Sequence, residues 1–245
     1  MLLEGKNAII TGSASGIGLA TLKLFAENGA NIWAFARKIS SDFEETINQL
    51  IEKNHIWIKP VYADLSNEEE LKKAFIEIRK EKVDILVNNA GTTYDALLPM
   101  ISAKKAKDLF DVNFFAQLQV TQFVSRMMQR QRSGVIVFTG SYLGIDGNRG
   151  QIAYSSTKAA VHGMVKALAK ELVVDGIRVN AVAPGVVDTK LLNSMTREEY
   201  DEAINKCGMK RAARPSEIAN MIMVLSSDLS SYVTGQIIRV DGGMN

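Results

Sequence analysis

A tyrosine and a lysine stand four residues apart in "YSSTK", residues 154–158, where an apolar helical pattern begins. In "YSSTKAAVHGMVKALAKEL" apolar residues recur at steps of about three and four, which is typical of a helix that faces a core. Tyr154 and Lys158 therefore share one helical face, one turn apart. A phenol beside an ammonium can exchange a proton with a substrate oxygen. Taken alone, these residues favour an ordinary first turn, with the lysine stem reaching to water.

Length and composition indicate a soluble globular protein. The 245 residues fit one domain, 1–245, with 47% hydrophobic and 23% charged residues. The formal charge of +2 is too small to imply nucleic acid or an anionic membrane as a partner. A single cysteine, Cys207, excludes an internal disulfide and offers no metal cluster, so we expect no metal. Without a signal-length or membrane-spanning apolar run, the expectation is a cytoplasmic protein.

Strand-like and helix-like patterns alternate along the chain. The apolar runs that read as strands are "NAIIT", "NIWAFA", "IWIKPVYA", "DILVNNA", "GVIVFTG", "IRVNAVAPG" and "QIIRVDGG". The helical patterns cover 17–28, 41–53, 67–80, 104–131, 153–174 and 215–226. This alternation predicts an α/β fold with a doubly wound parallel sheet and helices on both faces. The polar insertion 188–215 is of a kind that often forms a mobile lid, and we expect 190–212 to be a substrate loop.

Glycines mark the turn from the first strand to the first helix, in "AIITGSASGIGLATLKLFAENGA". Gly12, Gly16 and Gly18 permit a tight turn and a close approach to a pyrophosphate at the helix N-terminus, where free N–H groups and the helix dipole favour anions. A glycine-rich turn alone is weak evidence, but its place after the first strand strengthens it. The spacing is G-x-x-x-G-x-G, which differs from the usual dinucleotide pattern G-x-G-x-x-G.

With the motifs that follow it, this spacing resembles the short-chain dehydrogenase/reductase family over nearly the whole chain, which implies a Rossmann-type sheet. The matching motifs are "TGSASGIG" (11–18), "ADL" (63–65), "NNAG" (88–91), "DLFDVNFFA" with Asn113, "FTGSYLG" with Ser141, the Tyr154–Lys158 pair, "APGVVDT" (183–189) and "GQIIRVDGG" (235–243). The resemblance implies cofactor contacts by Gly12, Ser13, Ser15, Gly16, Ile17, Gly18, Asp64, Leu65, Asn89, Ala90, Gly91, Tyr154, Lys158, Pro184, Gly185, Val187 and Thr189.

The resemblance also implies a catalytic set. Tyr154 would give a proton to a carbonyl oxygen while reduced nicotinamide supplies hydride. Lys158, together with the positive charge of a bound oxidised nicotinamide, would lower the phenol pKa from its usual value near 10. Ser141 would hydrogen-bond the same oxygen, so that Ser141 and Tyr154 bind the substrate. By resemblance, Lys158 also holds the nicotinamide ribose, and Asn113 helps to hold a water that relays protons to Lys158. In isolation, Ser141 would be a hydroxyl capping a turn and Asn113 a polar kink in a helix.

The choice of cofactor can be read at the end of the second strand, "NIWAFARK". An acidic residue there would accept the ribose hydroxyls and repel a 2′-phosphate. Ala36 occupies that position and Arg37 follows, whose guanidinium suits a phosphate, although an arginine at a strand end is common on surfaces. The sequence therefore favours NADP(H), bound in part by Arg37. Asp64 is assigned to the adenine by resemblance; its alternative is an N-cap for the next helix.

Within the family, the chain most resembles the 3-oxoacyl-[acyl-carrier-protein] reductases of fatty acid biosynthesis. Those enzymes usually carry a basic residue before the glycine of "VVDGIRVN", where this chain has Asp175. Arg126, Arg130 and Arg132 near a helix C-terminus could dock an acidic acyl carrier protein, or simply complement the helix dipole. Two alternatives stay open: the same mechanism on another ketone or alcohol (sugar-, polyketide- or steroid-like), and a non-catalytic NADP-sensing module.

Other conspicuous residues have plainer interpretations. His162 lies two turns beyond Tyr154, and we expect it in packing or in a subunit interface. His55 is expected at the surface, and Asp95 is expected to cap a turn. By resemblance, the helices at 104–131 and 153–174 and the last strand pair between subunits, so the expectation is a homotetramer, with a dimer as the next alternative.

Overall fold

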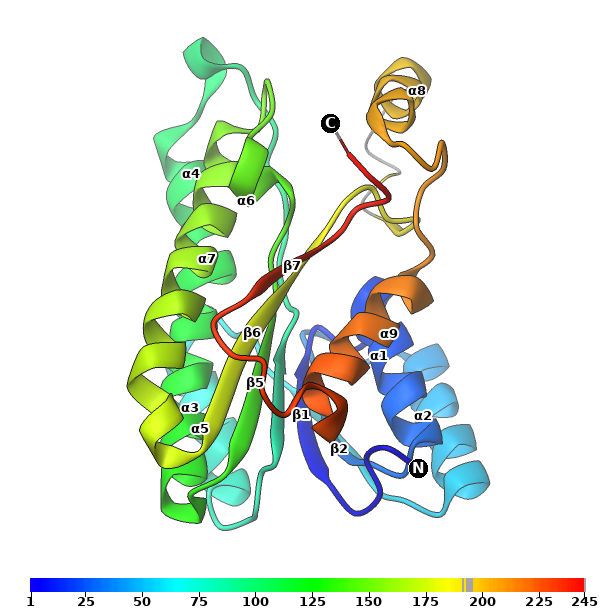
Figure 1. The fold of residues 1–245 in the computed structure, drawn as a ribbon, viewed down its shortest axis with the longest axis vertical. Helices are drawn as coiled ribbons and strands as arrows, with labels where there is room; N and C mark the ends of the chain where they lie inside the picture. Colours follow the sequence, from blue (N-terminus) through cyan, green and yellow to red (C-terminus); the bar gives the residue numbers. More distant parts are fainter. Residues whose placement is uncertain (191, 193–195, 245) are drawn as a thin grey trace.

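The computed structural model describes residues 1–190, 192 and 196–244. Its centre is a seven-stranded parallel sheet in the order β3-β2-β1-β4-β5-β6-β7 (Figure 1). The strands are β1 (Asn7–Thr11), β2 (Asn31–Ala36), β3 (Ile58–Tyr62), β4 (Ile85–Asn88), β5 (Gly134–Thr139), β6 (Ile177–Pro184) and β7 (Ile237–Val240). Each predicted apolar run contains one of these strands, and the predicted fold class is confirmed.

Helices cover both faces of the sheet. The α-helices are α1 (Gly16–Glu27), α2 (Ser41–Asn54), α3 (Glu68–Ile78), α4 (Ala103–Phe110), α5 (Ala116–Gln131), α6 (Leu143–Asp146), α7 (Ile152–Leu172), α8 (Arg197–Lys206) and α9 (Pro215–Ser226). Short 3₁₀ turns lie at Leu98–Met100, Val173–Asp175 and Asp228–Ser230. In Figure 1, α1, α2 and α9 pack on one face, and α3, α4, α5 and α7 on the other.

The apolar strands explain this two-sided arrangement. Successive side chains in a strand point to opposite faces of the sheet. In β1, Ala8 and Ile10 belong to the core beneath α1, α2 and α9, whereas Ile9 between them belongs to the core beneath α3, α5 and α7. All three are fully buried. A strand that is buried on both faces must be apolar throughout, which is the pattern of the sequence.

One predicted helix is interrupted. The pattern at 104–131 forms α4, a π-helical turn at Asp111–Phe115 and α5, in place of one continuous helix. Asn113 lies within the π turn, and its amide pairs with the backbone N–H and C=O of Thr92, both at 2.9 Å. A π turn inserts an extra residue into a helix and is frequent at functional sites. The π turn interrupts the α-helix where Asn113 bonds to Thr92, 21 residues away, and a local apolar pattern cannot reveal such a long-range contact.

The polar insertion contains α8, which begins with a capping box between Thr196 and Glu199. In Figure 1, α8 stands across from α4 and α6 at the end of the molecule to which the strands point. Residues 191 and 193–195 of the expected substrate loop lie outside the described residues. Within the described ranges, none of the helices has the length and apolar character to cross a membrane.

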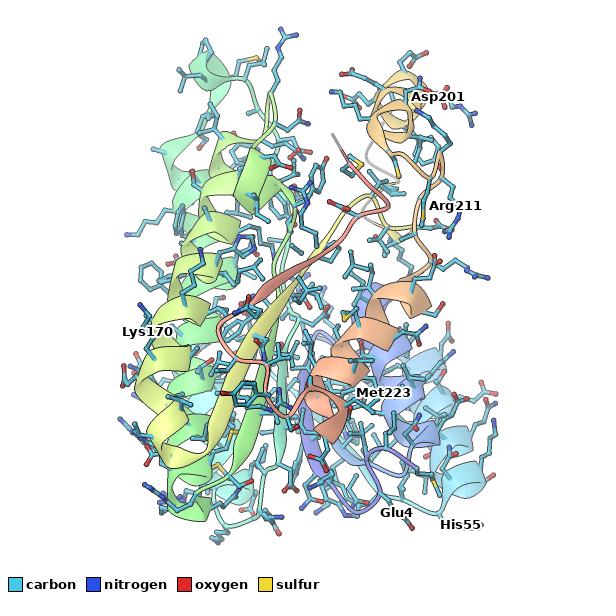
Figure 2. All side chains as sticks on the ribbon, viewed as in Figure 1. Glu4, His55, Lys170, Asp201, Arg211 and Met223 are labelled. Atoms are coloured by element: carbon cyan, nitrogen blue, oxygen red, sulfur yellow. The ribbon has the colours of Figure 1, made fainter. Side chains whose placement is uncertain are left out.

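Charged side chains lie at the periphery of the molecule in Figure 2, where Lys170, Asp201 and Arg211 are labelled. His55 is also there, exposed at the C-cap of α2 in a left-handed conformation with φ of 55°. Its predicted surface position is confirmed.

Candidate active site

Ser141, Tyr154 and Lys158 come together beyond the carboxyl end of β5. Ser141 is 5% exposed, in the turn between β5 and α6, and its Oγ accepts a hydrogen bond from Leu143 N at 3.2 Å. Tyr154 and Lys158 lie in the first two turns of α7. The Lys158 Nζ is 5.7 Å from the centroid of the Tyr154 ring and donates to Thr139 O at 2.8 Å. Lys158 is only 3% exposed, so it is not the solvent-reaching lysine of an ordinary first turn.

The protonation of this cluster is controlled by burial. Burial raises the pKa of Tyr154 to about 12, a hydrogen bond with Ser141 lowers it, and the charge of Asp95 raises it further. Burial lowers the pKa of Lys158 to about 8. The pKa of Tyr154 in the protein alone therefore lies above 10, because loss of water from around the phenolate outweighs the hydrogen bond with Ser141. The lowered pKa predicted from the sequence includes the positive charge of bound oxidised nicotinamide and stays a prediction. At neutral pH the phenol is protonated and the ammonium charged.

Asn113 lies next to the segment of α7 that carries Tyr154 and Lys158, and it is fully buried. Besides its bonds to Thr92, its Nδ2 donates to Thr157 Oγ1 at 3.1 Å, and Thr157 Oγ1 in turn donates to Tyr154 O at 2.7 Å. The side chain therefore ties the π turn to the segment of α7 between Tyr154 and Lys158. The plainer interpretation of Asn113, a polar residue at an irregular point of a helix, agrees with its place in the π turn, which lies beside Tyr154 and Lys158.

The glycine turn fits a cofactor whose phosphates pass close to the backbone. Gly12 has φ of +65°, and a Cβ there would stand 2.9 Å from Ala90 Cα. A Cβ on Gly18 would collide with Gly12 O. Asn89 Nδ2 donates to Thr11 O and Gly12 O, both at 3.2 Å, and thereby fastens the turn to the end of β4. Only glycine satisfies both positions, so the turn is packed as tightly as a dinucleotide loop requires.

The serines of the turn have different surroundings. Ser13 is fully buried, and its N and Oγ both donate to Phe35 O, at 3.0 and 2.9 Å, which joins the turn to β2. Ser15 is exposed at the N-cap of α1 and makes no side-chain cap bond. Ile17 follows in the first turn of α1. The first N–H groups of a helix have no partner within the helix, so this end of α1 is suited to an anion.

The expected adenosine contacts lie beyond β2 and β3. Arg37 is exposed immediately after Ala36, which is buried. The Asp64 carboxylate accepts hydrogen bonds from Ser66 N and Oγ, at 2.9 and 2.6 Å. These bonds lower the pKa of Asp64, and the charge of Arg37 lowers it further. The alternative role of Asp64 as a helix N-cap is wrong, because Asn67 caps α3. Leu65 is half-buried beside it.

Gly91 and the segment after β6 border the expected nicotinamide side. A Cβ on Gly91 would lie 3.2 Å from Asn113 Oδ1 and 3.7 Å from Lys158 Nζ, so a side chain at this position would crowd the catalytic cluster. Pro184 ends β6 and Gly185 follows. Further residues of this segment approach other elements: Val187 forms a β-bridge with Ala213, and the Thr189 methyl lies 3.1 Å from a Cβ placed on Gly16.

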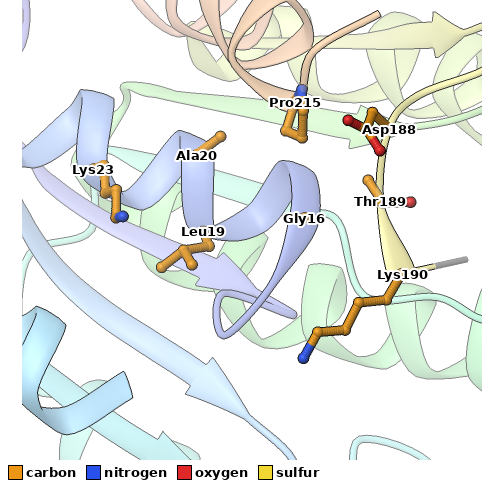
Figure 3. Close-up of a pocket in the computed structure, with 8 residues that line it drawn as sticks. All are labelled: Gly16, Leu19, Ala20, Lys23, Asp188, Thr189, Lys190 and Pro215. Carbon is orange, nitrogen blue, oxygen red and sulfur yellow. The ribbon is translucent and has the colours of Figure 1, made fainter. Parts of the chain in front are cut away.

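Thr189 also borders a cavity of about 490 Å³ between α1, α9 and the segment after β6 (Figure 3). Figure 3 shows Lys190 and Thr189 on one side and Gly16, Leu19 and Lys23 on the other. The cavity is separate from the Tyr154 cluster, none of whose members line it. In the described part of the chain, no group of three His, Cys, Asp or Glu side chains could hold a metal ion.

His162 and Asp95, for which the sequence predicts packing and a turn cap, also lie close to the Tyr154 cluster. His162 is 6% exposed and packs against Gly140 and Gly144, as predicted for a packing residue. Burial and the charge of Lys158 lower its pKa to about 4, so it is neutral at pH 7. Asp95 accepts from Thr93 Oγ1 at 3.0 Å, as a turn cap does. It also accepts from Gln151 Nε2 at 3.2 Å, a contact across 56 residues that the sequence did not reveal.

Of the three arginines near the C-terminus of α5, Arg132 is bound by residues of its own chain. Arg132 caps α5 in a left-handed conformation, and its guanidinium forms an ion pair with the Asp175 carboxylate and donates to Val174 O at 3.0 Å. Asp175 thus stands opposite an arginine of its own chain. Arg126 and Arg130 are exposed.

A glycine turn beside β1 and β4, where the strand order reverses, is the place where doubly wound sheets bind dinucleotides. Together with the phenol, hydroxyl and ammonium beside it, this defines a nicotinamide-dependent oxidoreductase. The family described as enoyl-(acyl carrier protein) reductase matches residues 12–245. The 3-oxoacyl-[acyl-carrier-protein] reductase FabG of Thermotoga maritima is 40% identical, over 100% of this chain and 99% of the relative. The chain belongs to the short-chain dehydrogenase/reductase family, and it is an oxidoreductase acting on CH–OH or C=O groups.

Solved structures agree with this assignment. One named as an NAD(P)-dependent gluconate 5-dehydrogenase of Beutenbergia cavernae, with bound NADP, is 33% identical, with a TM-score of 0.93 over 98% of this chain and 97% of the other. A 3-oxoacyl-[acyl-carrier protein] reductase of Brucella melitensis is 30% identical, with a TM-score of 0.92 over 99% of this chain and 92% of the other. The cofactor class is therefore NAD(P)(H).

Proposed function

We propose that this enzyme is an NADPH-dependent reductase that converts the ketone of a 3-oxoacyl thioester to a 3-hydroxyl group, with the acyl chain carried on an acyl carrier protein. The observation that carries the proposal is the cluster of Ser141, Tyr154 and Lys158, of which Ser141 and Lys158 are buried and Tyr154 is half-buried, in a chain similar from end to end to such a reductase. Fatty acid biosynthesis in the cytoplasm is the setting that this substrate implies.

The cofactor supplies hydride from its reduced nicotinamide when it is bound. The glycine turn and the N-terminus of α1 would hold its pyrophosphate, with Asp64 and Leu65 toward the adenine. The nicotinamide half would lie among three groups of residues: Asn89, Ala90 and Gly91 after β4, Pro184, Gly185, Val187 and Thr189 after β6, and Tyr154 and Lys158 on α7. The close packing of Gly91 against Asn113 and the tight packing of Gly12 and Gly18 support this placement.

Tyr154 acts as the general acid in the reduction. A pKa of about 12 keeps its proton in place at neutral pH until the substrate oxygen gains negative charge. Ser141 donates a hydrogen bond to the same oxygen. Lys158 is charged below its pKa of about 8 and stabilises the phenolate as it forms. Both Nδ2 hydrogens of Asn113 are used by Thr92 and Thr157, so a relay water would be held by the main chain at the π turn.

NADPH is proposed in preference to NADH because Arg37 is exposed beside Ala36, where an acid would select NADH. A relative with bound NADP supports this choice. Arg126 and Arg130 are the proposed contacts for the carrier protein. Arg132 is not proposed as a contact, because its guanidinium already pairs with the Asp175 carboxylate. The single domain is proposed to assemble as a homotetramer, with 190–212, including α8, as its substrate loop.

A spectrophotometric screen of NADPH oxidation tests this function. We expect kcat/KM for an acetoacetyl thioester to exceed that for cyclic, sugar and steroid ketones by at least tenfold. A non-thioester ketone with the higher kcat/KM would favour the same mechanism on another substrate. Binding of NADPH without turnover of any ketone would favour the sensing module.

A further inference from the structure

The guanidinium of Arg239, near the C-terminus, contacts three residues. It lies in β7, and its NH1 and NH2 contact the two carboxylate oxygens of Asp146 at 3.1 and 2.8 Å. Its Nε donates to Asp241 Oδ2 at 2.6 Å, and its NH2 also donates to Met244 O at 3.2 Å. A guanidinium is suited to such a fork, which one ammonium cannot reproduce. The side chain therefore joins two separate points of the fold.

The first of these points is the turn that carries Ser141. Asp146 ends α6, and its N–H donates to Tyr142 O at 3.0 Å. Tyr142 N in turn donates to Pro184 O at 3.0 Å, and Leu143 N donates to Ser141 Oγ. One short helical turn thus separates the Asp146 carboxylate from the hydroxyl proposed to bind the ketone. Holding Asp146 fixes the position of that turn against the end of β6.

The second point is the C-terminal segment, 241–244, to which the residues just after α8 are bonded. Cys207 forms an antiparallel β-bridge with Met244, and Gly208 N and Met209 N donate to the carbonyls of residues 243 and 242, both at 3.0 Å. The C-terminal segment, 241–244, is therefore the anchor of α8. Arg239 holds this segment at both ends, through Asp241 and Met244. Figure 1 shows α6 and α8 on opposite sides of it.

We propose that Arg239 is a positioning residue for the reduction, which holds the Ser141 turn and the anchor of α8 in one fixed relation. The ketone oxygen is bound from the Ser141 side and the rest of the substrate is enclosed from the α8 side, so both must be correctly spaced at once. This inference rests on the proposed function. Arg239 is expected to affect the ketone and not the glycine turn before α1, which none of these contacts reaches.

The test compares Arg239→Gln, Arg239→Lys and Asp146→Asn with the control Lys72→Ala, which removes an exposed ion pair on α3. Misplacement by about 1 Å can cost about 100-fold in rate, so we expect kcat/KM for an acetoacetyl thioester to fall roughly 10- to 100-fold in Arg239→Gln. Arg239→Lys should recover part of that loss. Asp241 packs closely against Gly185 on the proposed nicotinamide side, so some loss of NADPH affinity is expected, but it should be much smaller than the loss of kcat/KM. The control should match the wild type.

Hydrogen exchange without substrate separates this proposal from the proposed function. Arg239→Gln should speed amide exchange in both 142–147 and 207–209, whereas Asp146→Asn should speed it only in 142–147. Unchanged exchange in either segment of Arg239→Gln overturns the proposal, as does an unchanged kcat/KM or an equal loss of NADPH affinity. If the wild type reduces no ketone, the proposed function fails, while the exchange result still decides whether Arg239 joins the two segments.

Discussion

Replacing Lys158 by methionine should make the enzyme inactive and, at neutral pH, no less stable. The lysine is almost completely buried, and burial lowers its pKa from 10.5 to about 8. Keeping the buried ammonium charged therefore costs about 3 kcal/mol at pH 7, at about 1.4 kcal/mol per pKa unit. Methionine removes that cost but leaves Thr139 O without its donor, a loss of about 1–3 kcal/mol. The free energy of unfolding should rise by up to about 2 kcal/mol.

The pH dependence of this difference is the sharper prediction. Between pH 8 and 10.5 the unfolded lysine holds a proton that the folded one has lost, so wild-type stability gains with rising pH relative to the variant. From pH 7 to 9.5 the gain should be about 2 kcal/mol for a folded pKa of about 8. The advantage of the variant at pH 7 should therefore vanish or reverse by pH 9.5.

Urea unfolding of both proteins without cofactor measures this, at equal protein concentration because the stability of an oligomer depends on it. A stability difference that stays constant from pH 7 to 9.5 would show that the folded pKa of Lys158 is not depressed. The argument that this buried ammonium is kept for its charge would then fail. Turnover of the variant near that of the wild type would refute its role in the reaction.

Three further predictions concern cofactor, carrier and assembly. Arg37→Ala should lower the preference for NADPH over NADH roughly 10- to 100-fold, because a charge-assisted hydrogen bond contributes about 1.5–3 kcal/mol; an unchanged kcat/KM ratio would leave Arg37 a surface residue. Ala36→Asp should act in the same direction through repulsion of the 2′-phosphate. Added salt should reduce activity on carrier-bound substrate much more than on a small thioester if Arg126 and Arg130 dock the carrier, and equal sensitivity would remove them from that role. Sedimentation should give a homotetramer, and a stable monomer at working concentration would contradict the proposed pairing of subunits.

The fold was predictable because its signals are local. Ile9 and its neighbours are apolar in succession, which already indicates a strand covered on both faces. The glycine turn was equally visible, since Gly12 and Gly18 meet a steric demand imposed by the adjacent strand and helix. Boundaries of most helices followed from period alone.

What the sequence did not reveal depends on contacts between distant residues. The break at Asn113 accompanies bonds to Thr92, 21 residues away. The ion pairs of Arg239 with Asp146 and of Arg132 with Asp175 join elements that only the folded sheet brings together. The sequence showed the lysine beside Tyr154 but not the burial that raises the pKa of the phenol in the protein alone.

The most direct test of the account is the turnover of Tyr154→Phe with NADPH and an acetoacetyl thioester, beside Tyr232→Phe as a fully exposed control. Phenylalanine keeps the ring and removes only the proposed proton donor. We expect a loss of at least ~100-fold in kcat, as for removal of a general acid, with an unchanged Kd for NADPH and a control that behaves as the wild type. Near-normal turnover in a correctly folded Tyr154→Phe would contradict it.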